Sequence, residues 1–414
     1  MRKSRISKII VAGFFCLYGI GISSASCLTV RPGMSIAKAL TRIAEGDTLL
    51  LERGIYKEHD IVITKRIVIM GKDFPVIDGE FKYQLLIVHA SGVCVQGLQI
   101  QNSGKSSMND IAAIRVENVA NVTLWNNKLF NNTYGVMLQN VQGCFVLGNV
   151  IRSNSPDELN GGNGIHAWKC EHLVITGNTI SGHRDGIYFE FVTESVISSN
   201  LSTNNLRYGL HFMFSHNDTY TQNTFRANGS GVAVMYSKGV VMCNNQFDHN
   251  WGDASYGLLL KEISDSKIEH NQFTKNTVGI HLEGTNRISV KHCLFQDNGC
   301  ALHVQASCSG NVFEENNFLS NSFDVATNGT IALSTFKLNY WDKYDGYDLN
   351  KDHIGDVPYY PVSVYSVITQ KIPVSMILYR SFLTEIMDQV ERIVPTIIPD
   401  QWKDSSPSMK ILKL

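Results

Sequence analysis

The stretch GIYFEFVTESVISSNLSTNNLRYGLHFMF, residues 186–214, repeats its own opening after 23 residues: Gly186-Ile-Tyr-Phe returns as Gly209-Leu-His-Phe. The same pattern, a glycine followed by an aliphatic residue, any residue and an apolar residue, recurs along the chain. It starts at Gly135, Gly164, Gly186, Gly209, Gly231, Gly257 and Gly279, with Ala301 in the next place. Successive gaps are 29, 22, 23, 22, 26, 22 and 22 residues. Such a period indicates stacked repeats, in which each unit buries its apolar face against its neighbours.

Two series of asparagines follow the same period. The first contains Asn149, Asn178, Asn200, Asn223, Asn245 and Asn271; the second contains Asn154, Asn205, Asn228, Asn250, Asn276 and Asn298, with His183 in one place. Asparagine suits a corner because it tolerates left-handed backbone and bonds to nearby backbone groups. Stacked amides can also bond from coil to coil. The longer gaps are expected to be loops at residues 155–162 and 251–256.

Short β-rich segments between these corners predict an all-β, right-handed parallel β-helix, since crossovers between parallel strands are overwhelmingly right-handed. A leucine-rich repeat has a similar period but requires helical convex segments, which these β-branched segments do not favour. The solenoid is expected to span residues 27–360. Ile36, Ala39, Leu40 and Ile43 share one helical face, which predicts a helix that caps the N-terminal end.

Residues 361–414 have a different composition and are expected to form a helical docking or capping segment. Apolar residues at three- and four-residue spacing predict an amphipathic helix over roughly residues 374–394. They are Met376, Leu378, Phe382, Leu383, Ile386, Met387, Val390 and Val394. Two interpretations stay open: a cap on the solenoid, or an element that docks on a membrane partner.

Residues 1–26 are typical of an export signal. Arg2, Lys3, Arg5 and Lys8 precede an apolar run over residues 9–22, which is too short to span a membrane. Small residues at 24–26 predict cleavage after Ser26, with a lipid-modified Cys27 as the alternative. Export permits disulfides, although spacing does not give their pairing. Cys94, Cys144 and Cys243 lie beside strand-like runs, which favours buried small hydrophobes.

The alternation of side chains along a strand predicts which residues leave the core. Ile165, Ile187, Leu210 and their counterparts point inward. The outward pairs are then His166/Trp168, Tyr188/Glu190, His211/Met213, Ala233/Met235, Leu259/Lys261, His281/Glu283 and His303/Gln305. Beside them lie His183, Arg184, Asp185 and Tyr236.

Imidazole and thioether donors suit copper, and an exposed column of spaced donors suits weak, transferable binding. The copper-binding candidates are His166, His183, His211, Met213, Met235, His281 and His303. Trp168, Arg184, Asp185, Tyr188, Glu190 and Tyr236 are expected to line a surface groove beside them. His166 and His211 are two coils apart, about 10 Å, so they do not share one ion directly. The alternative is that aromatic and imidazole rings merely cover the sheet.

A second set of candidates follows the regular coils. Asp345, Asp348, Asn350, Asp352 and Asp356 place oxygens at alternate positions, the pattern that opens a calcium-binding loop. His353 stands where such a loop usually has glycine, and no glutamate follows at the twelfth position. Structural calcium and a solvated acidic turn are both compatible with this pattern.

Several longer runs resemble the NosD family, the periplasmic maturation proteins of nitrous oxide reductase. The runs are Gly182-His-Arg-Asp-Gly-Ile-Tyr-Phe-Glu-Phe, Leu206-Arg-Tyr-Gly-Leu-His-Phe-Met-Phe-Ser, Gly231-Val-Ala-Val-Met-Tyr-Ser-Lys, Tyr256-Gly-Leu-Leu-Leu-Lys, Asn339-Tyr-Trp-Asp-Lys-Tyr-Asp-Gly-Tyr-Asp and Gly355-Asp-Val-Pro-Tyr. The resemblance covers essentially the whole mature chain. It implies copper donors at His166, His183, His211, Met213 and Met235. It also implies that His353 departs from the family's usual glycine.

The resemblance implies a non-enzymatic role in the periplasm. Such proteins help to assemble the copper–sulfide centre of nitrous oxide reductase, passing on copper or sulfur species. Their partners are the reductase, a copper chaperone and the membrane subunit of an ABC transporter, which the C-terminal helix would contact. The formal net charge of −1 argues against a nucleic-acid partner.

The main rival is a carbohydrate-active enzyme, a polysaccharide lyase or epimerase, because such enzymes commonly use this fold and fold alone does not decide function. Arg184, Asp185, Tyr188, Glu190 and Arg207 could supply its acid and base groups. The Asp-Pro-His-Asp run of mannuronan epimerases is absent from the sequence. A passive adhesin-like scaffold is a third possibility, which the histidine and methionine columns disfavour.

Overall fold

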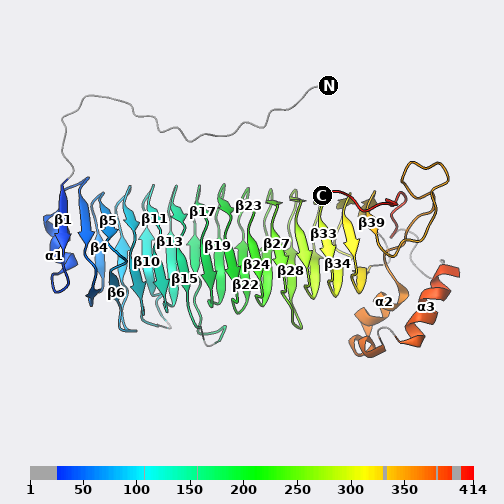
Figure 1. Ribbon diagram of the computed structural model, residues 1–414, viewed down its shortest axis with the longest axis horizontal. Helices are drawn as coiled ribbons and strands as arrows, with labels where there is room; N and C mark the ends of the chain where they lie inside the picture. The colour runs from blue at the N-terminus through cyan, green and yellow to red at the C-terminus, as the bar shows by residue number, and fades with distance from the viewer. Residues whose placement is uncertain (1–25, 107, 156, 330–332, 379–380, 394–401) are drawn as a thin grey trace, which may run out of the picture.

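The chain forms a long stack of coils with a short helix at one end and a helical arm at the other (Figure 1). The computed structural model describes residues 26–106, 108–155, 157–329, 333–378, 381–393 and 402–414. Each coil contributes one strand to each of three parallel sheets of 14, 13 and 12 strands, here called sheets A, B and C. The parallel β-helix predicted from the repeat is therefore confirmed.

Sheet A contains β1 (Cys27–Val30), β2 (Thr48–Leu51), β5 (Val68–Gly71), β8 (Cys94–Gln96), β11 (Thr123–Trp125), β14 (Phe145–Leu147), β17 (Val174–Thr176), β20 (Val196–Ser198), β23 (Thr219–Thr221), β26 (Val241–Cys243), β29 (Lys267–Glu269), β32 (Ser289–Lys291), β35 (Val312–Glu314) and β38 (Thr335–Lys337). Sheet B contains β3 (Ile55–Tyr56), β6 (Val76–Asp78), β9 (Gln99–Gln101), β12 (Lys128–Phe130), β15 (Val150–Arg152), β18 (Thr179–Ser181), β21 (Leu201–Thr203), β24 (Thr224–Arg226), β27 (Gln246–Asp248), β30 (Gln272–Thr274), β33 (Leu294–Gln296), β36 (Asn317–Leu319) and β39 (Tyr340–Trp341). Sheet C contains β4 (Ile61–Ile63), β7 (Leu86–Val88), β10 (Ala112–Glu117), β13 (Tyr134–Gln139), β16 (Ile165–Trp168), β19 (Asp185–Glu190), β22 (Tyr208–Met213), β25 (Ser230–Met235), β28 (Tyr256–Lys261), β31 (Val278–Glu283), β34 (Cys300–Val304) and β37 (Phe323–Thr327). The helices are α1 (Ile36–Arg42), α2 (Val364–Lys371), the 3₁₀ helix η1 (Pro373–Leu378) and α3 (Phe382–Ile393).

The bore is filled by the inward residues that the alternation predicts. Ile165, Ile187 and Leu210 are fully buried in one continuous core. In sheet B the inward side chains of six successive coils form a stack of near-parallel aromatic rings, with neighbouring centroids 4.0–5.6 Å apart. They are Phe225, Phe247, Phe273, Phe295, Phe318 and Trp341. Stacking these large rings removes much apolar surface from water at each coil, which stabilises the array.

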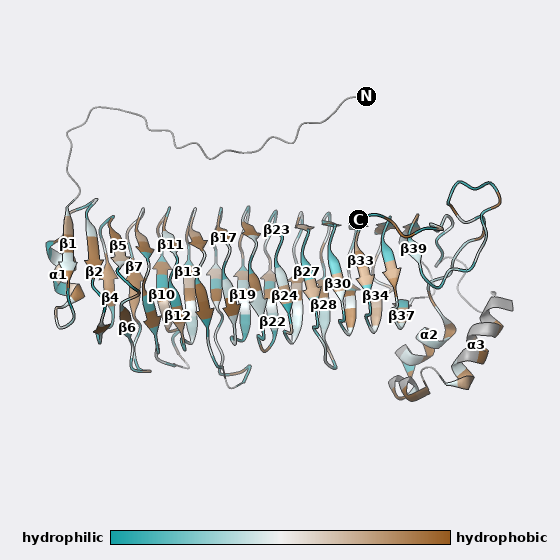
Figure 2. Cartoon of the chain, viewed as in Figure 1, coloured by the Kyte–Doolittle hydropathy of each residue, from teal (hydrophilic) through white to brown (hydrophobic). Residues whose placement is uncertain are grey.

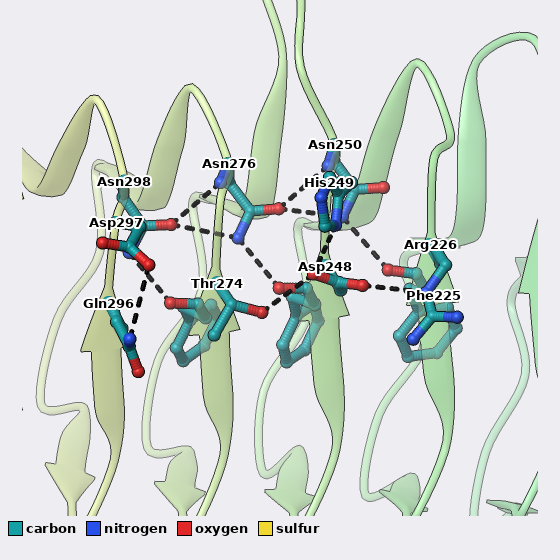
Figure 3. A network of polar contacts seen from close by, with 12 residues as sticks. Phe225, Arg226, Asp248, His249, Asn250, Thr274, Asn276, Gln296, Asp297 and Asn298 are labelled. Atoms are coloured by element: carbon teal, nitrogen blue, oxygen red, sulfur yellow. Dashed lines mark hydrogen bonds and ion pairs between the residues drawn. The ribbon is translucent and has the colours of Figure 1, made fainter.

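Buried asparagines tie the coils together at the corners. In the first series, Asn223 Oδ1 accepts from the backbone N–H and the Nδ2 of Asn200, and its own Nδ2 donates to the carbonyl of Ile197. The second series does the same at Asn250, Asn276 and Asn298 (Figure 3). Asn154 was expected in that series but is exposed and lies outside it, because the loop of residues 153–164 interrupts the corner there.

The repeated glycine is required by close packing between coils. A Cβ atom at Gly231 would lie 2.4 Å from the carbonyl oxygen of Gly257, and one at Gly209 would lie 2.7 Å from that of Gly231. Any larger residue would push neighbouring coils apart at the start of the sheet C strand, which explains the glycine periodicity.

The N-terminal end is closed by α1, as the sequence predicted. Ile36, Ala39 and Ile43 are buried, and Leu40 packs against the core. The Glu58 carboxylate accepts from the Ser35 hydroxyl and the backbone N–H groups of residues 36 and 37, while Lys65 Nζ donates to carbonyls at the other end of the helix. A negative group at the helix N-terminus and a positive group at its C-terminus complement the helix dipole.

The C-terminal end differs from the expected single helix over residues 374–394. The chain forms α2, η1 and α3 instead. The sequence pattern did not predict α2, which packs against β37. The chain then returns to the solenoid: Trp402 is buried, and Asp404 Oδ2 accepts from the backbone N–H and Nδ2 of Asn339 and from Nε1 of Trp341. Capping is therefore done by residues 402–412, and the helices form a separate arm.

The other terminal predictions concern the signal and the cysteines. Residues 1–25 of the predicted signal lie outside the described residues. The eight described cysteines are free thiols; Cys144 is buried, as predicted, while Cys94 and Cys243 are only half-buried. None of the described helices is long and apolar enough to cross a membrane.

Candidate functional site

The outer face of sheet C carries the predicted column of histidines in register. This outer column consists of His166, Tyr188, His211, Ala233, Leu259, His281 and His303, each paired with the next along the stack. A flanking column runs beside it: Trp168, Glu190, Met213, Met235, Lys261 and Glu283. The alternation along the strands therefore predicted correctly which residues of sheet C face away from the bore.

The outer column faces away from the bore but is not the exposed surface that the sequence suggested. His211 and His281 are only 4% and 6% exposed, and Ala233 is buried. Three tyrosine rings cover the histidines, with centroid distances of 5.7 Å for Tyr134–His166, 4.8 Å for Tyr208–His211 and 4.9 Å for Tyr256–His281. The sequence held a signal for this cover, because each of these tyrosines directly precedes a repeat glycine.

The first histidine group is built around a buried ion pair. Arg207 Nε and Nη2 donate to the Asp185 carboxylate at 2.9 and 2.5 Å, and the same Nη2 lies 3.1 Å from His211 Nδ1. Burial alone would raise the pKa of Asp185, but the contacts with His211 and Arg207 hold that pKa below its ordinary value. His211 Nδ1 lies 3.7 Å from Asp185 Oδ2, and its buried Nε2 has no hydrogen-bond partner.

Two methionines adjoin His211. Met213 follows two residues later on the outer face of β22, and Met235 is its register partner on β25. We call His211, Met213 and Met235 the imidazole–thioether cluster. The hydroxyl of Tyr188 lies 3.6 Å from Met213 Sδ and 3.3 Å from Glu190 Oε2, and burial followed by Glu190 raises the pKa of Tyr188 to about 12. The cluster thus combines one nitrogen and two sulfur donors on two adjacent strands.

His166 lies on the other side of Tyr188, and ring contacts of 4.8 and 5.0 Å link His166, Tyr188 and His211. Its Nδ1 is 3.0 Å from the amide Nδ2 of Asn163, a residue that the sequence did not single out. Burial lowers the pKa of His166 to about 4, so this ring is neutral near pH 7. Tyr188 lies on the coil between them, so His166 and His211 are two coils apart, as expected.

His183 does not lie in the outer column. It occupies a corner position of the second asparagine series, where its backbone N–H donates to Asn205 Oδ1, and its ring is fully buried. Neither ring nitrogen makes a well-formed hydrogen bond; burial lowers the pKa of this histidine to about 4, and the nearby backbone of Thr133 and Gly162 opposes this shift. The expectation of an outward donor at this position was therefore wrong, because the residue follows the corner and not the sheet.

The predicted groove residues lie on both sides of the outer column. Arg184 and Asp185 lie at its loop side, where Asp185 is buried, whereas Trp168, Tyr188 and Glu190 are half-buried. Tyr236 belongs to an exposed ladder of stacked rings with Phe191 and Phe214, at centroid distances of 5.3 and 5.0 Å. All three have positive φ, from 49° to 54°, where bulky residues are uncommon. The sequence did not predict this ladder.

The acidic loop uses its carboxylates on its own backbone. Asp348 accepts from the N–H groups of Lys351, Asp352 and His353, and Asp356 accepts from that of Leu349. His353 has a φ of 72°, the conformation for which glycine is usual. In the described ranges, no three His, Cys, Asp or Glu side chains are grouped to hold a metal ion. Calcium binding at Asp345, Asp348, Asn350, Asp352 and Asp356 stays a prediction.

The helical arm presents an apolar surface. On α3, Phe382, Leu383, Ile386 and Val390 are exposed by 40–78%, while Met387 packs inward against the cluster around Phe323 and Tyr365. Ile372, after α2, and Val374, Ile377 and Leu378 of η1 are exposed as well. Figure 2 shows the arm with α2 and α3 beside the last coils of the solenoid. The side chain of Met376 lies outside the described part of the chain.

Comparisons with known proteins agree with this architecture. Residues 155–351 match the family model described as NosD, periplasmic copper-binding protein. A protein of Pseudomonas aeruginosa named "Probable ABC transporter binding protein NosD" is 28% identical over 362 residues, covering 81% of this chain and 82% of the relative. The protein of the same name from Stutzerimonas stutzeri is 25% identical over 360 residues, covering 81% of each.

Solved structures show the fold alone. The surface adhesin PfbA of Streptococcus pneumoniae has a TM-score of 0.58 at 11% identity, covering 71% of this chain and 87% of that one. The A-module of the Azotobacter vinelandii mannuronan C-5 epimerase AlgE6 has a TM-score of 0.50 at 12% identity, covering 73% and 83%.

The fold and site together define a parallel β-helix protein that carries nitrogen and sulfur donors in register on the outside of one sheet. The family comparisons specify this class further. The chain is similar to the NosD family over residues 155–351, and to relatives named NosD over 81% of its length.

Proposed function

We propose that this chain is a periplasmic copper-binding protein that takes copper as cargo at the imidazole–thioether cluster. The observation that carries the proposal is the register of His211, Met213 and Met235, which brings one imidazole and two thioethers together on adjacent strands. Thioethers favour Cu(I), and imidazole also suits copper. The description of the matching family model, periplasmic copper-binding protein, supports the same conclusion.

The surroundings of His211 fit a metal ligand. Its Nε2 is a buried polar atom without a partner, which usually costs about 1–3 kcal/mol unless something else occupies the position. Metal-binding histidines commonly donate their second N–H to a carboxylate. Asp185, 3.7 Å from Nδ1, is the nearest carboxylate, and Arg207 Nη2, which donates to Nδ1 at 3.1 Å, would have to turn away before Nδ1–H could donate to it.

The imidazole–thioether cluster and the outer column suit the transfer of copper better than its storage. Only three donors share this part of the outer face, and Tyr188 separates them from His166 at the next coil position. A closed four-ligand cage would hold copper tightly, whereas an incomplete set leaves room for a donor from the protein that delivers or receives the ion. Copper would reach the cluster from a copper chaperone and leave it toward nitrous oxide reductase, whose copper–sulfide centre the protein helps to assemble without itself being an enzyme.

The helical arm is the proposed contact with the membrane subunit of an ABC transporter. Packing holds the arm against the last coils, because α2 contacts β37 and Met387 of α3 packs against the cluster around Phe323 and Tyr365. Amphipathic helices with unpaired apolar faces are typical docking elements. Both curated relatives are named for ABC transporter binding, which supports this assignment.

The test is a Cu(I) titration against a competing chelator of known affinity, under anaerobic conditions. The variant His211→Ala/Met213→Ala/Met235→Ala is expected to bind Cu(I) at least about 100-fold more weakly than the native chain. A matched control, His270→Ala/Met70→Ala, removes an exposed histidine and an exposed methionine far from the cluster and should leave the affinity unchanged. Equal affinity in the cluster variant and the native chain would contradict the proposal.

A further inference from the structure

Long connections from sheet B to sheet C leave the solenoid at one corner, on the edge toward which the helical arm extends (Figure 1). Two of them, which we call the corner loops, link β15 to β16 over residues 153–164 and β27 to β28 over residues 249–255. The connections that lead into β19, β22 and β25 between them are short. The imidazole–thioether cluster lies on β22 and β25, so the corner loops lie on either side of it.

Each corner loop exposes one large apolar side chain beside carboxylates. Leu159 is 95% exposed and directly follows Asp157 and Glu158. Trp251 is 64% exposed and lies two residues before Asp253. The three acidic residues are exposed as well, and the stretches 157–160 and 251–254 contain no lysine or arginine. The two loop tips therefore combine an apolar group with negative charge.

Hydrogen bonds order both tips. In the first corner loop, Asp157 Oδ1 accepts from the backbone N–H of Asn160 at 2.8 Å and from its Nδ2 at 3.1 Å. In the second, Thr277 Oγ1 accepts from the backbone N–H of Gly252 and donates to its carbonyl, each at 3.0 Å. Ordered loops lose less conformational entropy when they bind a partner, which favours binding.

The ends of the corner loops contact the outer column. Asn163 Nδ2 lies 3.0 Å from His166 Nδ1, and a Cβ atom at Gly161 would lie 3.2 Å from the Cβ of Arg184. Tyr256 directly follows the second corner loop, and its ring covers His281. A protein bound at the tips would therefore lie beside the outer column.

We propose that the corner loops are the docking site for the protein that receives copper from the imidazole–thioether cluster. This inference rests on the proposed function, which names nitrous oxide reductase as that protein. Strands β16 and β28 are four coils apart, about 19 Å, which fits within a standard interface of about 800 Å² per partner. A partner that contacts both tips would therefore span β22 and β25 and face the cluster.

The charge of the tips favours a partner with a basic surface. An anionic bilayer attracts lysine and arginine, so Asp157, Glu158 and Asp253 disfavour contact with a membrane. Basic residues of a partner protein would pair with these carboxylates, which chiefly raises the rate of association. Trp251 would be the main apolar anchor, because tryptophan is enriched among the interface residues that contribute most to binding.

The test measures the binding of purified, copper-free nitrous oxide reductase to the immobilised native chain by surface plasmon resonance. Leu159→Ser/Trp251→Ser is expected to weaken this binding by at least about 100-fold. A matched control, Leu201→Ser/Trp125→Ser, removes an exposed leucine and an exposed tryptophan from sheets B and A and should bind as the native chain does. Both variants keep the cluster, so their Cu(I) affinity should be unchanged.

A second variant, Glu158→Gln/Asp253→Asn, keeps the shape of both tips and also serves if the serine variant does not fold. It should slow association by about 10-fold at low salt and make the rate less dependent on salt.

The proposal is overturned if these variants bind the reductase as the native chain does, or if the native chain does not bind it. It is also overturned if the tips instead bind vesicles of phosphatidylethanolamine and phosphatidylglycerol. A cluster variant that loses Cu(I) but still binds the reductase supports the docking site, so the docking site and the copper site can fail separately.

Discussion

The two histidine groups of the outer column lie on the same face of the same sheet, yet their surroundings give them different chemistry. Around His211, a buried Asp185–Arg207 pair and two methionines supply charge and sulfur. Around His281 and His303 lie the Gln305 amide and, in the flanking column, the Lys261–Glu283 ion pair. The solenoid sets position and spacing, and the residues in the flanking column and the preceding loops set the chemistry of each group.

A large effect is expected from breaking the ion pair between Asp185 and Arg207. Arg207→Leu leaves the buried Asp185 carboxylate without its main partner, and such a loss typically costs about 3–5 kcal/mol. Urea unfolding should show this loss. Asp185→Asn combined with Arg207→Leu should recover most of it, since no charge is then left unpaired. A single variant as stable as the native chain would contradict the account of this group.

A smaller effect is expected at the other end of the column. Asp404→Ala removes the acceptor for three N–H groups of Asn339 and Trp341, which should cost about 2 kcal/mol locally. Hydrogen exchange should then increase in residues 317–341 and in the arm, but not around His211. Equal exchange in both regions would show that the capping tail does not stabilise the C-terminal coils separately.

Acid should affect both groups alike. The pKa values of His166 and His281 are lowered to about 4, below the ordinary 6.5, so the unfolded chain binds protons first as the pH falls. The contribution of these two histidines to the free energy of unfolding is therefore fully present above pH 6.5. It decreases between pH 6.5 and pH 4, by about 1.4 kcal/mol per pH unit for each histidine. His166→Gln/His281→Gln should flatten the curve measured by urea unfolding. An unchanged slope would contradict burial as the cause.

A substitution that restores the corner should stabilise the chain. His183→Asn replaces a ring whose nitrogens make no well-formed hydrogen bond by the residue that the series otherwise uses, and about 1 kcal/mol of added stability is expected. Thermal unfolding measures it, with Asn205→His, the reverse change one coil away, as the comparison. Destabilisation by His183→Asn would show that the imidazole makes a favourable contribution at this corner.

The smallest effect concerns the ring between the first two histidines. Tyr188→Phe removes a hydroxyl that contacts Glu190 and Met213 but keeps the stack with His166 and His211, so about 0.5–1 kcal/mol should be lost. Urea unfolding can resolve this difference.

The repeat in the sequence predicts most of the fold. Gly209 and Gly231 mark where coils approach closely, and the asparagine series marks the corners, so the phase of sheet C followed directly. The exceptions are positions that tertiary contacts decide. Asn154 lies outside the corner series, beside an inserted loop, and in place of the helix expected over residues 374–394 the chain forms η1 and α3.

The site was predicted less completely than the fold. Alternation along the strand correctly placed His211, Met213 and His281 outside the bore. It could not show that Tyr208 and Tyr256 cover them, because this depends on how the preceding turns fold over the sheet. His183 was misplaced for a different reason: it lies at a corner just before the strand, where the alternation does not apply.

The central claim is that thioethers and an imidazole of the same cluster bind Cu(I). X-ray absorption of the native chain loaded with one equivalent of Cu(I) tests it most directly, in parallel with Met213→Leu/Met235→Leu. The account predicts mixed sulfur and nitrogen scattering around copper in the native chain, with the sulfur contribution lost in the variant. A copper environment of nitrogen and oxygen alone, or one that the variant leaves unchanged, would contradict it.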